Sequence, residues 1–403
     1  MSFYFAPLFN GLGLFSVADI IPKSPHFYRP TWAEINLGAF RENLEALGRL
    51  LPPSVGVLAV LKADGYGHGA VALAREAVKL RKLPLWGFGV SSVEEGVVLR
   101  RAGIRQRVLI LGSLFPFESF RAALKHGLTP TIASRAAALV LARKASRLKR
   151  PMAVHLKVDT GMGRIGMSPA TAIQTAVDIV KTKGLCLQGV YTHLAQGDVA
   201  RPTRVQLGLF GRVLESVRRV RPGVLGHVAN SAAAMAFPES HYDLVRPGLA
   251  LYGVFPAPQL RFRVKLSPVL TWKTRVVFLK AVPVGTAVSY GGTFRTARPS
   301  RLATLPVGYG DGYKRSLSNR AQVLMKGRRC PVVGRVTMDQ IVVDVTDVPG
   351  VKVGEETVLL GAQGEERVSA EELAVWADTV PYEILCGITA RVPRIVIAGR
   401  KER

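Results

Sequence analysis

The first two thirds of the chain alternate between short apolar runs and longer amphipathic stretches. The amphipathic stretches, such as Val93–Ala102 and Pro116–His126, carry apolar residues at helical spacing. Eight strand–helix alternations in about 200 residues favour a closed (β/α)8 barrel over an open doubly wound sheet, which usually stops at five or six strands. The eight predicted strands are Val55–Leu61, Leu85–Val90, Val108–Leu111, Leu128–Ile132, Met152–Val158, Leu187–Tyr191, Val224–Val228 and Leu244–Leu251.

The pattern changes after residue 265, where strand-like runs follow one another between Gly and Pro residues. These runs are Leu270–Leu279, Leu302–Val307, Arg320–Met325, Arg329–Val336, Gln340–Asp344 and Glu356–Leu360. We therefore predict an α/β chain with an N-terminal extension (1–29), a TIM-type barrel (30–265) and a C-terminal, mainly β domain (266–403). The segment Thr31–Asn36 precedes the first barrel strand, and either adds a strand to the barrel or joins the C-terminal domain.

Composition excludes several classes of protein. Three cysteines (Cys186, Cys330 and Cys386) lie far apart and lack CxxC spacing, which argues against a disulfide framework or a zinc site and favours a reducing compartment. Residues 3–21 are apolar, but Asn10 and Asp19 interrupt them and no basic residue precedes them. They make a poor signal peptide and a poor membrane span, so we expect a cytoplasmic protein without a membrane role.

The formal net charge of +27 has two interpretations. Lys and Arg are scattered rather than gathered in a run interleaved with aromatic residues, which favours a solvated basic surface over a specific nucleic-acid site. Such a surface attracts anions non-specifically, so nucleic-acid binding stays open as a less favoured alternative.

Polar and ionisable residues follow five of the eight predicted barrel strands, at the face where barrel enzymes carry their active sites. Lys62 follows the first strand, where an apolar surround would lower the pKa of the amine and favour Schiff-base chemistry. A lysine that only extends its amine to the barrel rim is the alternative. Gly65, Gly67 and Gly69, on either side of Tyr66, allow the backbone to approach a ligand closely.

A phosphate site is indicated after the seventh and eighth strands. Asn230 and Ser231 begin a helix with a capping hydroxyl, and Gly248 and Leu249 supply free backbone N–H groups nearby. An ordinary helix cap at Ser231 is the alternative. His193 and Arg246, at the ends of the sixth and eighth strands, are ambiguous alone, although a buried Arg246 needs an anion or an acceptor.

These segments resemble those of the alanine racemases, a fold-type III pyridoxal-phosphate family. The Lys62 segment AVLKADGYGHG (59–69) is similar to the family's cofactor-lysine signature, with Asp64–Gly65 in place of a commoner Asn–Ala pair. Thr337 stands where some relatives have cysteine. The resemblance continues in family order through 155–166, 191–193, 229–233, 245–248, 288–292, 305–313, 334–340, 382–383 and 391–394.

The resemblance implies pyridoxal-phosphate-dependent racemisation of L-alanine to D-alanine for cell-wall peptidoglycan. Lys62 would bind the cofactor covalently and would remove or return the α-proton on one face of the substrate. Tyr290, from the partner subunit of a homodimer, would do the same on the other face, so that the mechanism has two bases. The remaining roles implied are cofactor binding by Tyr66, Arg164, His193 (hydrogen-bonded to Arg246), Asn230, Ser231, Arg246, Gly248, Leu249 and Tyr382, substrate binding by Arg164, Met338 and Tyr309, and an entrance lined by Arg315 and Arg335.

Lys157 is expected to be carbamylated, as in many members of the family, because an anion there relieves repulsion among the basic side chains and orients Arg164. Two other hypotheses share the barrel and the lysine. A non-catalytic pyridoxal-phosphate carrier would lack the β domain with Tyr290 and Met338. A decarboxylase of longer diamino acids would differ in the motifs around Tyr309 and Met338.

Overall fold

The computed structural model describes residues 28–146 and 151–397, so the predicted extension falls almost entirely outside the described residues. Contacts divide the described chain into two units. Unit 1 comprises residues 28–32, 272–368 and 390–393, and unit 2 comprises 33–146, 151–271, 369–389 and 394–397. The boundary falls within strands β1 (Thr31–Asn36) and β10 (Leu270–Arg275).

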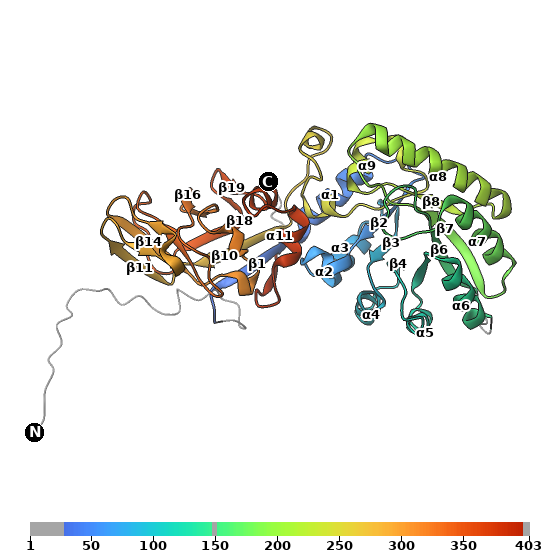
Figure 1. Cartoon of the computed structure of the whole chain (residues 1–403), viewed down its shortest axis with the longest axis horizontal. Helices are drawn as coiled ribbons and strands as arrows, with labels where there is room; N and C mark the ends of the chain where they lie inside the picture. Colours follow the sequence, from blue (N-terminus) through green and yellow to red (C-terminus); the bar gives the residue numbers. More distant parts are fainter. Residues whose placement is uncertain (1–27, 147–150, 398–403) are drawn as a thin grey trace, which may run out of the picture. The chain divides into compact units, whose positions relative to one another are not determined.

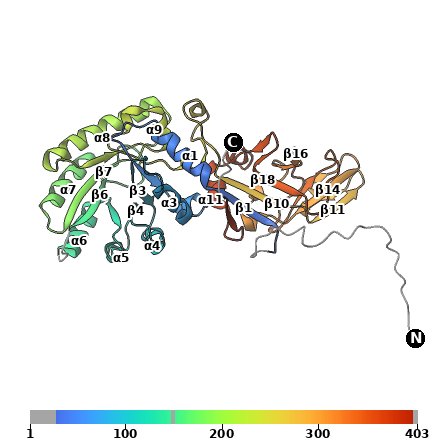
Figure 2. The ribbon, with the colours of Figure 1, turned by 180° about the vertical axis from the view of Figure 1, so that it is seen from behind.

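Unit 2 contains a closed barrel of eight parallel strands, which confirms the predicted fold class. Helices α4 to α8 lie on the outer side of the strands (Figure 1), and the view from behind shows α6 and α7 at the same outer edge (Figure 2). The strands are β2 (Gly56–Val60), β3 (Leu85–Val90), β4 (Arg107–Ser113), β5 (Thr129–Ile132), β6 (Met152–Lys157), β7 (Leu185–Tyr191), β8 (Leu225–His227) and β9 (Leu244–Val245).

Side-chain caps set the start of several barrel helices. Ser92, Ser134 and Ser168 each accept a hydrogen bond from the backbone N–H three residues later. The helices of unit 2 are α1 (Leu37–Gly48), α2 (Lys62–Tyr66), α3 (Ala70–Val78), α4 (Val93–Arg101), α5 (Ser119–Lys125), α6 (Arg135–Ala145), α7 (Pro169–Lys181), α8 (Ala200–Val220), α9 (Ser231–Ala236), α10 (Ala370–Trp376) and α11 (Pro381–Gly387). Short 3-10 turns follow at η2 (Pro238–Ser240), η3 (Leu249–Tyr252) and η4 (Pro258–Phe262).

The structure corrects one predicted strand boundary of the barrel and decides one position that the sequence left open. The eighth strand ends at Val245 instead of Leu251, since Pro247 has no N–H for a strand ladder and the chain turns into η3. Strand β1 lies outside the closed barrel and is hydrogen-bonded next to β10, which decides between the two positions left open for Thr31–Asn36 in favour of the second; its residues 33–36 also pair in parallel with β20 (Arg394–Ile397). Helices α10 and α11 were not expected from the sequence and belong to unit 2.

Unit 1 is mainly β, as predicted. Its antiparallel pairs link β10 with β18 (Glu356–Gln363), β18 with β15 (Gln322–Met325) and β19 (Glu366–Val368), and β15 with β16 (Arg328–Pro331). A second sheet has the order β11 (Phe278–Val282), β14 (Ser300–Leu305), β17 (Ile341–Asp344), and β12 (Ala287–Val288) pairs with β13 (Phe294–Arg295). Three short turns, η5 (Tyr290–Gly292), η6 (Tyr309–Asp311) and η7 (Arg315–Leu317), carry candidate site residues.

The predicted single strand Leu270–Leu279 is two strands, because the chain changes partners within it. The Val276 N–H donates to the Glu355 carbonyl, whereas the next residue, Val277, donates to the carbonyl of Thr304. Strand β10 therefore stays with β18, and β11 begins the second sheet.

Candidate active site

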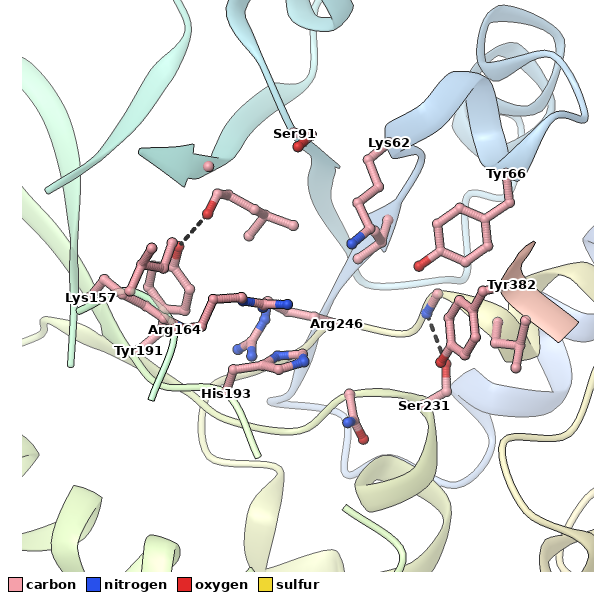
Figure 3. A pocket seen from close by; sticks show the side chains of 17 residues that line it. Lys62, Tyr66, Ser91, Lys157, Arg164, Tyr191, His193, Ser231, Arg246 and Tyr382 are labelled. Carbon is pink, nitrogen blue, oxygen red and sulfur yellow. Dashed lines mark hydrogen bonds between the residues drawn. The ribbon is translucent and has the colours of Figure 1, made fainter. Parts of the chain in front are cut away.

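The ionisable residues expected at the strand ends converge on one cavity of about 530 Å³ in unit 2 (Figure 3). Its charged lining residues are Lys62, Lys157, Arg164 and Arg246, and none of its lining residues is acidic. In Figure 3, Lys157 and Arg164 lie on the left of the cavity, and the hydroxyl-bearing side chains of Tyr66, Tyr382 and Ser231 lie on the right. Such a donor set fits a polyanionic ligand with a phosphate group. Further lining residues are Val60, Ser91, Leu111, Gly112, Ile165, Tyr191, His193, Asn230, Gly248 and Leu249.

Lys62 begins a left-handed turn directly after β2. Ala63, Asp64 and Tyr66 have φ angles of 52°, 50° and 52°, and Gly65 has 63°. Each non-glycine residue with a left-handed backbone conformation costs about 1–2 kcal/mol, so the surrounding structure must hold the turn in place. The carboxylate of Glu95 supplies part of that support by accepting hydrogen bonds from the backbone N–H groups of Ala63 (2.7 Å) and Ser91 (2.6 Å).

Burial lowers the pKa of the Lys62 amine, and the charge of Arg164 lowers it further. More of the amine is therefore neutral at physiological pH than for an exposed lysine. A neutral amine can attack a carbonyl carbon or accept a proton.

The hydroxyl side of the cavity is built around Tyr66. Its ring stacks on Tyr252 with centroids 4.7 Å apart and lies 5.7 Å from the ring of Tyr382. Burial raises the pKa of Tyr66 and that of Tyr382, so both phenols stay protonated and can donate hydrogen bonds. Gly248 leaves space for the Tyr66 hydroxyl, because a Cβ at position 248 would lie 2.6 Å from that oxygen.

The predicted phosphate segment is present, with two corrections. The cap of α9 is the side chain of Asn230, which accepts from the Ala233 N–H at 3.0 Å, and not the hydroxyl of Ser231. Ser231 Oγ instead accepts from the N–H groups of Gly248 (2.8 Å) and Ala250 (3.3 Å). The Gly248 N–H is therefore already bonded, contrary to the prediction that it is free. The hydroxyl proton of Ser231 stays available to a ligand.

The basic side of the cavity surrounds the ring of Tyr191. Lys157 is only 4% exposed, and its Nζ lies 4.3 Å from the centre of that ring. The guanidinium carbon of Arg246 lies 5.1 Å from the same centre. Burial, together with Arg246 and Arg164, holds the pKa of Lys157 well below its ordinary value. This environment therefore favours the neutral form of the Lys157 amine.

Arg246 is 4% exposed and donates to three acceptors. Its Nη1 lies 2.9 Å from Nδ1 of His227, and its Nη2 donates to the carbonyls of Thr192 (2.7 Å) and Val228 (2.9 Å). The predicted hydrogen bond with His193 is thus replaced by one with His227. Burial lowers the pKa of Arg246 to about 10, so its positive charge persists at neutral pH.

A second hydrogen bond extends this arrangement into the barrel. His227 Nε2 lies 2.8 Å from His155 Nδ1, and His155 Nε2 lies 3.4 Å from Gln188 Oε1. Both histidines are buried, and burial lowers the pKa of His155 to about 3 and that of His227 well below its ordinary value. The sequence analysis did not identify His155, His227 or Tyr191 as site residues. A lone polar residue within a strongly apolar strand was the available signal.

His193 follows β7 and lines the cavity as expected. Burial and then Arg246 hold the pKa of its imidazole well below the ordinary value, so the ring is neutral. A neutral, flat ring in a cationic cavity is suited to stacking against a ligand.

The other predicted residues lie in unit 1. Tyr290, in η5, is 72% exposed, and the preceding Ser289 donates from Oγ to the Arg335 carbonyl (2.7 Å). Tyr309 and Met338 lie in adjacent segments, because the N–H groups of Tyr309 and Gly310 donate to the carbonyls of Thr337 (3.0 Å) and Met338 (2.9 Å). Arg315 and Arg335 line a separate cavity of about 310 Å³ with Thr293, Ser316, Ser318, Asn319 and Arg320.

Within the described residues, no helix combines the length and the apolar character that crossing a membrane requires.

Comparison with known proteins agrees with this geometry. Residues 35–256 match the family model of the alanine racemase N-terminal domain, and residues 269–396 match that of the C-terminal domain. The alanine racemase of Symbiobacterium thermophilum is 50% identical over 370 residues, which cover 91% of this chain and 97% of the relative. That of Halothermothrix orenii is 44% identical, with 91% and 96% covered.

Solved structures give the same result. The alanine racemase of Clostridium difficile 630 superposes with a TM-score of 0.86 at 35% identity, covering 93% of this chain and 97% of that one. An alanine racemase from Bacillus anthracis with bound L-Ala-P has a TM-score of 0.84 at 33% identity, covering 94% and 97%. The resemblance seen in the sequence is confirmed, and the chain belongs to the alanine racemase family.

Proposed function

We propose that this protein interconverts L-alanine and D-alanine with pyridoxal phosphate held in the cavity around Lys62. The observation that carries the proposal is the composition of that cavity: four basic side chains, no acidic lining residue, and a group of phenols and a hydroxyl on one side. When bound, pyridoxal phosphate supplies an electron sink that makes the α-proton of the substrate acidic.

The chain's own residues would divide the binding of this group between them. Tyr66, Tyr382 and Ser231 would donate hydrogen bonds on the phosphate side, together with the backbone at Leu249, while Gly248 leaves space for the Tyr66 hydroxyl. His193 would lie against the ring, and Arg246 would offer a positive charge to the ring nitrogen. Because Arg246 does not readily release a proton, it discourages protonation of that nitrogen and limits side reactions.

Racemisation needs a proton acceptor on each face of the substrate. Lys62, whose pKa is lowered by burial, takes or returns the proton on one face. Tyr290 serves the other face from the partner subunit of a homodimer. Met338, Tyr309 and Arg164 hold the substrate, and Arg315 and Arg335 line its entrance. The exposure of Tyr290, Tyr309 and Met338 in a single chain supports a role at a subunit interface.

Two variants test the shared site directly. As homodimers, Lys62→Ala and Tyr290→Phe should each racemise alanine at least about 100-fold more slowly. Co-refolding them should restore racemisation, since half of the sites in a mixed dimer then carry both residues. Co-refolded chains that stay inactive, although sedimentation shows dimers, would contradict the shared site.

The cofactor is tested separately. The purified protein should absorb visible light after incubation with pyridoxal phosphate, and borohydride reduction should leave a mass label on the Lys62 peptide. Lys62→Ala should lose the label, whereas Lys125→Ala, a change on the outer face of α5, should keep it. A label on another lysine would contradict the assignment of Lys62.

We also propose that Lys157 is carbamylated. Its amine is kept neutral and is therefore nucleophilic, and a carbamate would place an anion beside Arg164 and Arg246. Incubation with 13C-bicarbonate should give one carbamate carbon signal, absent in Lys157→Ala. A bare amine at saturating bicarbonate would contradict this modification.

The cellular role that we propose is the supply of D-alanine for peptidoglycan in the cytoplasm. Expression of the chain should allow a bacterial strain that requires D-alanine to grow without it, and Lys62→Ala should not.

A further inference from the structure

Arg394 connects two segments that lie far apart in the sequence and carry different parts of the cavity. Its Nε donates to the carbonyl of Gly67 at 3.0 Å, 327 residues earlier in the chain. Its Nη1 and Nη2 donate to the carbonyls of Thr389 (2.5 Å) and Ile388 (2.6 Å), which follow α11. One guanidinium thus binds the turn after Lys62 and the end of the helix that begins with Pro381 and Tyr382.

The turn itself packs directly on that helix. Gly67 has a φ angle of 78°, and a Cβ there would lie 2.7 Å from the carbonyl oxygen of Leu385 and 3.6 Å from Nη2 of Arg394. Only glycine permits so close an approach between two backbones. Burial lowers the pKa of Arg394, and the negative charge of Asp64, within the same turn, partly offsets that effect.

On the helix side, the guanidinium lies at the carbonyl end of α11. Cations are favoured at helix C-termini, because the last carbonyls lack partners within the helix. At the other end of α11, Tyr382 reaches the cavity, and its ring lies 5.7 Å from that of Tyr66. The position of Tyr382 relative to Tyr66 therefore depends on how α11 is held against the turn.

We propose that Arg394 is a positioning residue for cofactor binding: it fixes the distance between the Lys62 turn and α11, so that Lys62, Tyr66 and Tyr382 face one ligand together. The inference rests on the proposed function, since it assigns that ligand as pyridoxal phosphate. Arg394 is not among the residues that line the cavity, so it acts through Gly67 and α11 and not by contact with the cofactor.

The test compares Arg394→Gln and Arg394→Lys with the parent protein and with Arg204→Gln. Arg204 lies on the exposed side of α8 and forms an ion pair with Glu239, so its loss removes a comparable charge far from the turn. Two readouts are needed: the Kd for pyridoxal phosphate from its absorbance, and amide hydrogen exchange at residues 67–68 and 385–389.

We expect Arg394→Gln to raise the Kd at least about 10-fold and to speed exchange in both segments, while strands β2–β9 keep their protection. The KM for alanine should stay within about twofold, because no substrate contact is removed. The Kd and the exchange rates of Arg394→Lys should lie between those of the parent protein and Arg394→Gln. An ammonium keeps the charge but cannot reach three carbonyls in the planar geometry of a guanidinium. Arg204→Gln should match the parent.

The proposal is overturned if both Arg394 variants keep the parent's Kd and exchange rates. It is also overturned if protection is lost uniformly across the barrel, because Arg394 would then serve general stability only, and failure of both variants to fold counts as this second result. A parent protein that does not take up pyridoxal phosphate would contradict the proposed function, and the exchange measurement alone would then decide whether Arg394 couples the two segments.

Discussion

Nη1 of Arg246 lies 2.9 Å from Nδ1 of His227, and this bond fixes the proton positions on two buried histidines. A guanidinium can only donate, so His227 Nδ1 accepts and its proton resides on Nε2. His227 Nε2 therefore donates to Nδ1 of His155, and His155 Nε2 donates to Gln188. Every bond points away from Arg246, which keeps both imidazoles neutral and the charge on the guanidinium.

Removing His227, the middle residue of this series of hydrogen bonds, should destabilise the protein. His227→Leu leaves Nη1 of Arg246 and Nδ1 of His155 without partners in the barrel interior, and we expect the free energy of unfolding to fall by about 2–4 kcal/mol. Gln188→Leu removes only the long outer bond and should cost less than about 1 kcal/mol. Urea unfolding measures both values, and equal losses would contradict a network held by Arg246.

The histidines also predict how stability depends on pH. Below pH 6.5 the unfolded chain binds a proton on His155, whereas the folded protein does not until about pH 3. The unfolded state thus binds more protons between these values, and the folded state loses stability as pH falls, by up to about 1.4 kcal/mol per pH unit for each such group. His155→Gln should have a shallower slope in urea unfolding between pH 6.5 and 4.5, and an unchanged slope would rule this origin out.

Tyr290→Phe should separate proton removal from inversion. We expect racemisation to slow at least about 100-fold, since a positioned acid or base contributes about 10²–10⁴. Exchange of the α-hydrogen in deuterated water should continue for one enantiomer only, because Lys62 still serves its own face. Tyr28→Phe, at a side chain that is 98% exposed, is the matched control. Loss of exchange for both enantiomers would argue for a single base.

Gly248→Ala should disturb the phosphate side of the cavity. The new Cβ would meet the Tyr66 hydroxyl at 2.6 Å, so the phenol must move, and we expect the Kd for pyridoxal phosphate to rise at least about 10-fold. Gly208→Ala, on α8 with no neighbour within 4 Å, should leave the Kd unchanged and stabilise the protein by about 0.5–1 kcal/mol. If Gly248→Ala bound pyridoxal phosphate with an unchanged Kd, the assignment of Tyr66 to the phosphate site would be wrong.

Hydrophobic periodicity was sufficient to predict the barrel and most of its strand boundaries, because the strands are short apolar runs separated by longer amphipathic segments. Hydrophobic periodicity failed where backbone hydrogen bonding between strands determines where a strand ends. At Val276 the chain changes partner strands, and at Pro247 a missing N–H ends an apolar run early. Neither event alters the apolar pattern itself.

The sequence predicted most of the ionisable residues that line the candidate site, but not the buried residues, such as His155, that support them. His155 occupies space left by Gly189 on the neighbouring strand, where a Cβ would lie 2.4 Å from the imidazole ring. Such a fit depends on the register between β6 and β7, which a single sequence does not display. Tyr290 could be assigned only by resemblance, since no pattern within one chain indicates which residues of two copies meet.

The charged residues that line the Lys62 cavity are all basic, and this has a practical consequence for handling the apoprotein. Multivalent counter-ions in the buffer, such as sulfate or inorganic phosphate, would occupy the same donors and raise the melting temperature once their concentration exceeds their Kd. Reconstitution carried out in phosphate buffer would then underestimate the true affinity for the cofactor, and a non-coordinating buffer of matched ionic strength is the better medium.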